Sequence, residues 1–428
     1  MSDCQKKGDT GWFQKDRFGM FIHWGLYAVP GRHEWIQHNE RIKVEDYRKY
    51  FEHFDPDLYD PKEWARMAKA AGMKYLVITT KHHEGFCLWD TKYTDYKAPN
   101  TPCGKDVLKP MIEAFREEGL RVGFYYSLID WHHPEFPIDK FHPQRDDKEF
   151  REQEKGRDVS KYAEYMRNQV RELLTDFGKI DIIWFDFSYP VEDGKGKDDW
   201  ESEKLYKLVR ELQPDIIIND RLDIPGVGDI KTPEQYQPSE GLKDEDGNPI
   251  VWEGCQTFSG SWGYHRDKES WKSVQMLIEM LIYHVSRDGN LLLNVGPTGR
   301  GEFDYRAINS LNGMGEWMKR HSRAIYGCKN PPAEFKTPLD CRYTWNPETK
   351  RLYLHILVWP FRTLHLEGLG GRVKYAQLLN DGSEIKFSTS KNTVASTMSE
   401  KTKDTAVSLT LPIKKPNVAV PVIELFID

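Results

Sequence analysis

The chain has 428 residues, enough for one large domain and a smaller one. Its net charge is −6, with acidic and basic residues mixed along the whole length, so we expect no nucleic-acid partner. The longest apolar runs are far shorter than a membrane span, so we expect no membrane partner either. The first residues contain no apolar signal core and the six Cys form no CxxC pair, which predicts a cytoplasmic protein; a monomer and a homo-oligomer both fit this composition.

Eight strand-like runs recur along the first two thirds of the chain. Apolar, β-branched and aromatic residues dominate them, as is typical of strands buried on both faces. The runs are Gly19–Trp24, Tyr75–Thr80, Arg121–Ser127, Asp181–Asp186, Asp215–Asn219, Asp229–Thr232, Val251–Gln256 and Asn290–Val295. Six stretches between them have helical periodicity: Pro61–Ala71, Val107–Glu118, Ser160–Phe177, Asp198–Leu212, Lys268–Ser286 and Asp304–Ser322.

This alternation predicts an α/β fold with a parallel sheet, and the count of eight strands predicts closure into a TIM-like (β/α)8 barrel. No helical pattern occurs between Asp220 and Val251, so we expect an irregular barrel. A doubly wound open sheet is the alternative fold. It is disfavoured because no GxGxxG follows the first strand and no GxxxxGK[ST] occurs in the chain.

The pattern changes after about Lys329, where short β-type runs separated by turn residues replace the alternation. The clearest runs are Leu352–Val358 and Val418–Ile427. Pro421 lies inside the second run and predicts an edge strand, because Pro cannot donate to the ladder. We therefore predict a catalytic barrel over residues 1–330 and an antiparallel β domain over residues 331–428 that packs on it.

The strand Asp181–Asp186 ends on a carboxylate after four large apolar residues. Such a charge is costly unless the chain keeps it for chemistry, and the carboxyl ends of barrel strands are where catalytic residues gather. Other strand ends also carry polar or aromatic groups: His23 and Trp24; His82, His83 and Glu84; Tyr125, Tyr126 and Ser127; Asp220 and Arg221; Glu234; Glu253. One such group could be a satisfied core residue, but this many together predict an active site.

Two kinds of chemistry fit such a site. Barrel metallohydrolases present His-x-His at a strand end, whereas His82 and His83 are adjacent and the chain has no HExxH, so a metal site is not expected. A pair of carboxylates is the other possibility, with Asp186 ionised and a later Glu protonated. Such pairs hydrolyse glycosides, with retention at a separation of about 5–5.5 Å and inversion at a wider one.

Seven segments of the chain form a set in this order: Phe18–Gly25, His82–Phe86, Trp184–Asp186, Thr232–Gln235, Trp252–Glu253, Ser261–Tyr264 and Asn290–Pro297. Together they resemble the α-L-fucosidases of glycoside hydrolase family 29. The resemblance implies an irregular (β/α)8 barrel with a C-terminal antiparallel β-sandwich, and no metal or other cofactor. It implies a retaining exo-hydrolase that removes terminal α-L-fucosyl residues from oligosaccharides or glycosides through a covalent fucosyl-enzyme.

The resemblance also implies roles for single residues. It makes Asp186 the nucleophile. The other matching positions would bind the sugar: His23, Glu34, Trp35, His82, His83, Tyr126 (or its neighbour Tyr125), Trp184, Arg221 and Trp262.

Two glutamates compete for the role of acid/base. Glu234 lies 48 residues after Asp186 in a turn-like segment, and Glu253 lies 67 residues after it on a strand. A general acid needs a raised pKa and freedom to switch to base, which suits a partly desolvated loop end, so we favour Glu234. Glu253 would then bind the sugar. A metal-dependent barrel hydrolase and a catalytically weak carbohydrate-binding homologue stay open as alternative functions.

Overall fold

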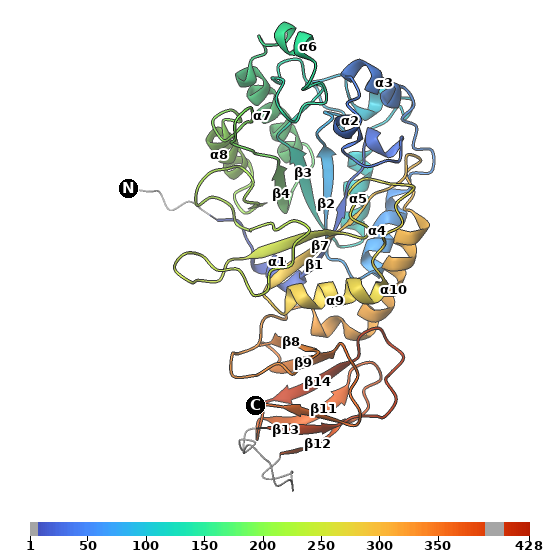
Figure 1. Ribbon diagram of the computed structural model, residues 1–428, viewed down its shortest axis with the longest axis vertical. Coiled ribbons are helices and arrows are strands. Elements are labelled where there is room, and N and C mark those ends of the chain that lie inside the picture. The colour runs from blue at the N-terminus through green and yellow to red at the C-terminus, as the bar shows by residue number, and fades with distance from the viewer. Residues whose placement is uncertain (1–6, 390–405) are drawn as a thin grey trace.

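The computed structural model describes residues 7–389 and 406–428. Its central element is a parallel sheet of seven strands: β1 (Phe18–Ile22), β2 (Tyr75–Lys81), β3 (Arg121–Ser127), β4 (Ile182–Asp186), β5 (Ile217–Ile218), β6 (Trp252–Thr257) and β7 (Gly289–Val295). The strand order is β5-β4-β3-β2-β1-β7-β6. The sheet is curled, with helices on its outside (Figure 1), so the fold is α/β, as the sequence predicts.

The two faces of the sheet belong to two different hydrophobic cores. Residues on the concave face pack against one another inside the curl, among them Phe21, Tyr125 and Trp184. Their neighbours along the same strands, such as Tyr126 and Phe185, pack outward against the helices. Because both faces are buried, the strands read as nearly continuous apolar runs.

All six helical patterns correspond to helices of the structure: α4 (Pro61–Ala70), α5 (Leu108–Glu117), α7 (Val159–Thr175), α8 (Ser202–Leu212), α9 (Val274–Val285) and α10 (Tyr305–His321). Several begin at a side chain that accepts a hydrogen bond from the first turn, as Asp60 does for α4 and Ser273 for α9. Shorter helices lie in the loops: α1 (Gly11–Asp16), α2 (Ile36–Asn39), α3 (Val44–Glu52) and α6 (Lys148–Gln153), with 3-10 turns at Leu26–Ala28, Ala98–Asn100 and Ser322–Ala324.

The segment Asp229–Thr232, predicted as a strand, forms isolated bridges instead. Ile230 pairs with Asn219, and Lys231 pairs with Trp252. The carboxylate of Asp229 explains the local geometry, because its Oδ2 accepts the backbone N–H of Ile218 at 2.8 Å and also pairs with Arg210. A side chain here replaces part of the regular backbone ladder.

The C-terminal part forms two antiparallel sheets. One has the order β11-β14-β9-β8 and the other β10-β13-β12. The strands are β8 (Cys341–Asn346), β9 (Arg351–Ile356), β10 (Thr363–Leu366), β11 (Val373–Leu378), β12 (Lys386–Thr389), β13 (Val407–Thr410) and β14 (Val422–Ile427). The prediction of an edge strand from Pro421 is wrong: β14 is paired on both sides, and Pro421 lies just before its first residue, where no N–H is needed.

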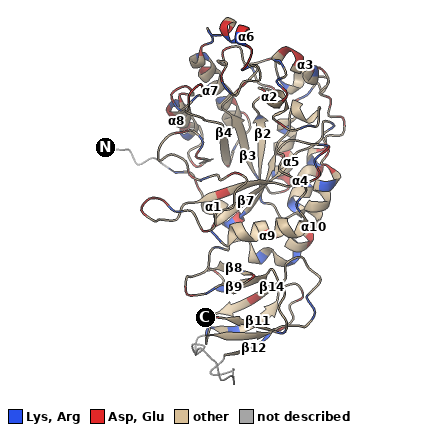
Figure 2. Cartoon of the chain, viewed as in Figure 1, with Lys and Arg blue, Asp and Glu red and all other residues tan. Residues whose placement is uncertain are grey.

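Acidic and basic residues are interspersed along the outer helices (Figure 2). Within residues 7–389 and 406–428, no helix is long and apolar enough to cross a membrane. The cytoplasmic location, the oligomeric state and the domain boundary near residue 330 stay predictions.

Candidate active site

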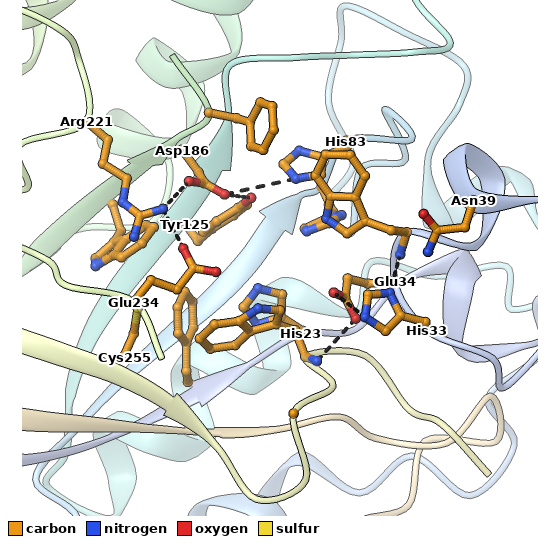
Figure 3. A pocket seen from close by; sticks show the side chains of 17 residues that line it. His23, His33, Glu34, Asn39, His83, Tyr125, Asp186, Arg221, Glu234 and Cys255 are labelled. Atoms are coloured by element: carbon orange, nitrogen blue, oxygen red, sulfur yellow. Dashed lines mark hydrogen bonds and ion pairs between the residues drawn. The ribbon is translucent and has the colours of Figure 1, made fainter. Parts of the chain in front are cut away.

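A cavity of about 410 Å³, here called the pocket, lies where the carboxyl ends of β1 to β4 meet. Figure 3 shows its side chains pointing toward a common centre. Its lining residues are Phe21, His23, His33, Glu34, Trp35, Asn39, His82, His83, Tyr125, Trp184, Asp186, Phe187, Arg221, Glu234, Cys255, Gly260 and Trp262. The pocket therefore brings together most of the site residues that the sequence predicts.

Asp186 is the last residue of β4 and its carboxylate reaches the pocket. Its Oδ2 accepts a hydrogen bond of 2.7 Å from the hydroxyl of Tyr125, and its Oδ1 lies 2.7 Å from Nη1 of Arg221. These two donors hold the carboxylate in one orientation.

Arg221 joins Asp186 to Glu234. The same Nη1 atom lies 2.9 Å from Oε2 of Glu234, and the guanidinium lies over the Trp184 ring at 4.3 Å from its centre. Arg221 also donates to the backbone carbonyl and the hydroxyl of Thr232, at 3.0 and 3.2 Å. The side chain of Glu234 is 40% exposed, so its carboxyl can meet both a ligand and water.

Three histidines form one wall of the pocket. His82 and His83 have ring centres 3.9 Å apart, and those of His23 and His82 are 5.5 Å apart. Burial, followed by the nearby imidazole of His82, lowers the pKa values of His23 and His83 well below the usual range of histidine. Both rings are therefore neutral at neutral pH.

Glu34 lines the pocket and also holds the backbone of the Trp262 segment. Its Oε2 accepts backbone hydrogen bonds from Trp262 at 3.1 Å and Gly263 at 2.8 Å, and its Oε1 lies 3.3 Å from His33 Nε2. Its neighbour Trp35 packs on His83, with ring centres 4.9 Å apart. The pair thus ties the Trp262 segment to the wall that carries His83.

Tyr126 does not line the pocket, so the preference for Tyr126 over Tyr125 as the sugar-binding residue of β3 is wrong. Its hydroxyl donates to Oε1 of Gln169 at 2.7 Å, on the outer face of the sheet. Tyr125, the neighbour that the sequence left open, points inward to Asp186. The reason is the alternation of side chains along a strand.

Glu253 does not line the pocket either, although the sequence offered it as a sugar ligand and as the second choice of acid/base. It is the second residue of β6, fully buried inside the curled sheet, where it accepts a hydrogen bond from the hydroxyl of Tyr75. Burial raises the pKa of its carboxyl to about 8.

Within the described ranges, no group of three or more His, Cys, Asp or Glu side chains is arranged to hold a metal ion. Asp186 and Glu234 are both paired with Arg221, and the imidazoles of His23 and His83 carry protein hydrogen bonds on Nδ1. The arrangement suits a pair of carboxylates acting on a polyhydroxylated ligand.

Comparison with known proteins shows the family to which the chain belongs. The family model described as Alpha-L-fucosidase matches residues 1–323. The chain belongs to the α-L-fucosidase family. It is 30% identical to the human plasma alpha-L-fucosidase over 382 residues, which cover 82% of this chain and 76% of the relative.

Solved structures of fucosidases have the same fold. Alpha-L-fucosidase isoenzyme 1 from Paenibacillus thiaminolyticus is 46% identical, with a TM-score of 0.91 and 98% of each chain covered. A family 29 fucosidase from Bacteroides thetaiotaomicron, trapped as a covalent intermediate with 2-fluoro-fucosyl fluoride, is 29% identical, with a TM-score of 0.83 and 99% and 97% of the two chains covered. This chain is thus a member of a glycoside hydrolase family.

Sequence reasoning missed several residues of this fucosidase pocket: Phe21, His33, Asn39, Phe187, Cys255 and Gly260. Phe187 directly follows Asp186 and has a φ of 75°, a backbone reversal that no sequence pattern announces. Phe21 could have been found, since it lies two residues before His23 on β1 and faces the same way.

Proposed function

We propose that this protein is a retaining exo-α-L-fucosidase that hydrolyses terminal α-L-fucosyl residues by double displacement. The observation that supports it best is the Asp186 carboxylate, held by Tyr125 and Arg221 at the pocket and joined through Arg221 to a second carboxyl group on Glu234. Two carboxyl groups are what glycoside hydrolysis needs.

In the first step, an Asp186 oxygen attacks the anomeric carbon while the bond from this carbon to the leaving oxygen breaks. Glu234 gives its proton to that oxygen, so the aglycone leaves as an alcohol. In the second step, Glu234 takes a proton from water, the water oxygen attacks the anomeric carbon, and the bond to Asp186 breaks. Asp186 is regenerated as a carboxylate, and Glu234 regains its proton.

The distances around Arg221 support retention over inversion. Oδ1 of Asp186 and Oε2 of Glu234 lie 2.7 and 2.9 Å from one nitrogen, so the two oxygens cannot be farther apart than the sum of these distances. That limit is shorter than the separation of about 6.5–9.5 Å typical of inverting enzymes and compatible with the 5–5.5 Å of retaining ones. The trapped covalent intermediate of the Bacteroides thetaiotaomicron fucosidase supports the same mechanism.

The size and lining of the pocket support an exo mode of action on fucosylated glycosides. About 410 Å³ is near the lower limit of small-molecule sites and suits one sugar ring better than a chain of rings. Trp35, Trp184 and Trp262 offer apolar faces to the ring, and the histidines face its hydroxyls.

The finer fold proposal is a closed, irregular (β/α)8 barrel with a C-terminal β-sandwich. The bridges at Ile230 and Lys231 support closure, because they connect the edge strands β5 and β6 through the segment predicted as an eighth strand. The two C-terminal sheets share one buried apolar cluster, which supports a sandwich.

The proposal is tested with 2-fluoro-fucosyl fluoride and an aryl α-L-fucoside. We expect hydrolysis of the aryl fucoside with or without a chelator, and labelling of Asp186 in the peptide map of the inactivated protein. Asp186→Asn should lose turnover by several orders of magnitude and take up no label. Label on another residue would overturn the assignment, loss of activity with EDTA that zinc restores would favour a metal-dependent hydrolase, and an inactive but sugar-binding protein would favour a carbohydrate-binding homologue.

A further inference from the structure

The imidazole of His83 is hydrogen-bonded to the hydroxyl of Ser127, and this hydroxyl donates its only hydrogen to a backbone carbonyl. His83 Nδ1 lies 2.7 Å from Oγ of Ser127, and this hydroxyl donates to the backbone carbonyl of Ile129, also at 2.7 Å. Ser127 is fully buried. A hydroxyl has one hydrogen and a carbonyl has none, so Ser127 can only accept from His83. Nδ1 of His83 must therefore carry the proton.

His23 is held by the same logic through an amide. Its Nδ1 lies 2.6 Å from Oδ1 of Asn294, and the amide nitrogen of Asn294 donates to the backbone carbonyl of Trp262 at 2.6 Å. Turning the amide around would place two oxygens against each other, so this orientation is the only one that satisfies both contacts. Nδ1 of His23 is thus a donor as well.

Both rings are neutral, so each Nε2 atom keeps a lone pair and no hydrogen. Both rings line the pocket, and each Nδ1 is hydrogen-bonded to a side chain of the protein, which leaves Nε2 for a ligand. Nε2 of His83 lies 4.0 Å from Oδ2 of Asp186, which is another acceptor. The two Nε2 atoms and this oxygen are all hydrogen-bond acceptors, so a ligand has to supply the hydrogens for the two Nε2 atoms.

We propose that Ser127 and Asn294 are positioning residues that lock His83 and His23 as the Nδ1–H tautomers. The pocket then demands a hydroxyl hydrogen from the sugar at each Nε2 atom. This specificity rule rests on the proposed function, since it assumes that a sugar occupies the pocket. A sugar that lacks either hydroxyl, or carries an ether there, leaves a buried lone pair unmatched and is rejected.

The C-terminal sheet contains a matched pair with the opposite tautomer. Nε2 of His355 lies 2.9 Å from Oγ1 of Thr344, and this hydroxyl donates to the carbonyl of Ala324 at 2.7 Å. The same reasoning assigns the hydrogen of His355 to Nε2. His284 and His321 provide references for the Nδ1–H form, because each Nδ1 faces a backbone carbonyl, at 2.7 and 2.8 Å.

The first experiment reads the tautomers directly, by 15N NMR of the protein labelled in histidine alone. We expect His23 and His83 to give the pattern of His284 and His321, and His355 to give the reverse pattern. In Ser127→Ala the His83 signals should move toward a mixture of tautomers, whereas Thr344→Val should move only those of His355. An Nε2–H form of His23 or His83 in the unaltered protein overturns the proposal, whether or not the variants fold and whether or not the protein cleaves fucosides.

The second experiment asks whether the locked tautomers decide specificity. kcat/KM is measured for an aryl α-L-fucoside and its three monodeoxy analogues, and the penalty for each missing hydroxyl is compared between variants, which cancels the intrinsic reactivity of each analogue. We expect two of the three penalties to be about tenfold or more in the unaltered protein. One penalty should shrink in Ser127→Ala, the other in Asn294→Leu, and neither in Thr344→Val.

Penalties that are unchanged in both Ser127→Ala and Asn294→Leu would overturn the specificity rule. If the unaltered protein hydrolyses no fucoside, that result contradicts the proposed function and leaves the NMR result valid.

Discussion

Arg221 connects the two carboxyl groups of the pocket through a single nitrogen atom. A guanidinium cannot be deprotonated in a protein, so it supplies a fixed positive charge between Asp186 and Glu234. When Asp186 forms the bond to the anomeric carbon, the negative charge on its carboxylate decreases. Arg221 can then interact more strongly with Glu234 or with the sugar. The residue thus links the two halves of the proposed mechanism.

Replacing Glu234 by Ala should be most harmful for fucosides with poor leaving groups, because these need a proton from the acid. Aryl fucosides with good leaving groups should still form the covalent intermediate, and added azide should restore turnover by taking the place of base-activated water. The measurement is kcat across a leaving-group series, with identification of the fucosyl azide product. Glu253→Gln is the control and should give no azide product. Azide rescue in neither glutamate variant would assign the acid/base role to another carboxyl group.

Glu253 should make the fold less stable as the pH rises. Its carboxyl has a pKa of about 8 in the folded chain against about 4.3 when unfolded, so between these values the folded state binds more protons. The contribution of Glu253 to stability is complete below pH ~4.3 and is lost as the pH rises through about 8, at up to ~1.4 kcal/mol per pH unit.

The test compares thermal midpoints at pH 5, 7 and 9. Gln cannot ionise, so the Tm of Glu253→Gln should decline less over this range than the Tm of the unaltered protein. Parallel curves for the two proteins would show that the carboxyl does not titrate in this window.

The sequence located Asp186 and the histidines because buried strands that end on polar groups are rare. It could not decide between Tyr125 and Tyr126, since both neighbours are aromatic and alternation alone does not say which face is concave. The sequence placed Glu253 at the pocket, which it does not line, for a different reason. It is buried near the amino end of β6, whereas the pocket lies at the carboxyl ends of the strands. The sequence does not show how far these two ends are from each other in the fold.

At the level of elements, the helices were predictable because the apolar face of each recurs with helical periodicity and several have capping residues at their starts. The eighth strand was not, because the side chain of Asp229 competes for the backbone of β5. The sequence placed Pro421 inside a strand, whereas β14 begins one residue later, at Val422. The prediction of an edge strand depended on this boundary, and the residues around Pro421 do not define it to within one position.

The packing of α9 on β6 depends on the absence of a side chain at Gly254. A Cβ atom built there would lie 2.1 Å from Nε2 of His284, a fully enclosed ring on α9. Gly254→Ala should therefore destabilise the fold by about 1–3 kcal/mol, seen as a lower midpoint in chemical unfolding.

Two variants make this interpretation specific. Gly156→Ala, where a Cβ meets nothing within 4 Å, should change the midpoint little. His284→Ala combined with Gly254→Ala should recover part of the loss, because the clash is gone. Additive losses in the double variant would mean that the two residues do not interact.

At the level of the whole molecule, the C-terminal sheets are attached to the helices of the larger part by buried polar contacts. The indole of Trp317 on α10 donates to the carbonyl of Val420 at 2.8 Å, and Thr344 donates to Ala324 at 2.7 Å. Tyr353 and Val422 belong to the same apolar cluster as the helices. The C-terminal part thus covers apolar surface of the larger one.

A fragment that ends at residue 330 should consequently be less stable than the full chain, because it exposes the apolar surface around Trp317 and leaves that indole unpaired. We expect aggregation or a lower thermal midpoint, measured by size-exclusion chromatography and circular dichroism. A monomeric fragment with the midpoint and fucosidase activity of the full chain would show instead that the larger part folds independently.

The neutral state of His23 and His83 has a consequence for the environments in which the protein can work. Imidazoles usually gain charge on moving from the cytosol to an acidified organelle, and a site built on them then changes character. Burial, followed by the nearby imidazole of His82, lowers the pKa values of these two rings well below the usual range of histidine, so they resist gaining charge as the pH falls. On moving from neutral to mildly acidic surroundings, the hydrogen-bonding pattern of His23 and His83 should therefore change less than that of exposed imidazoles.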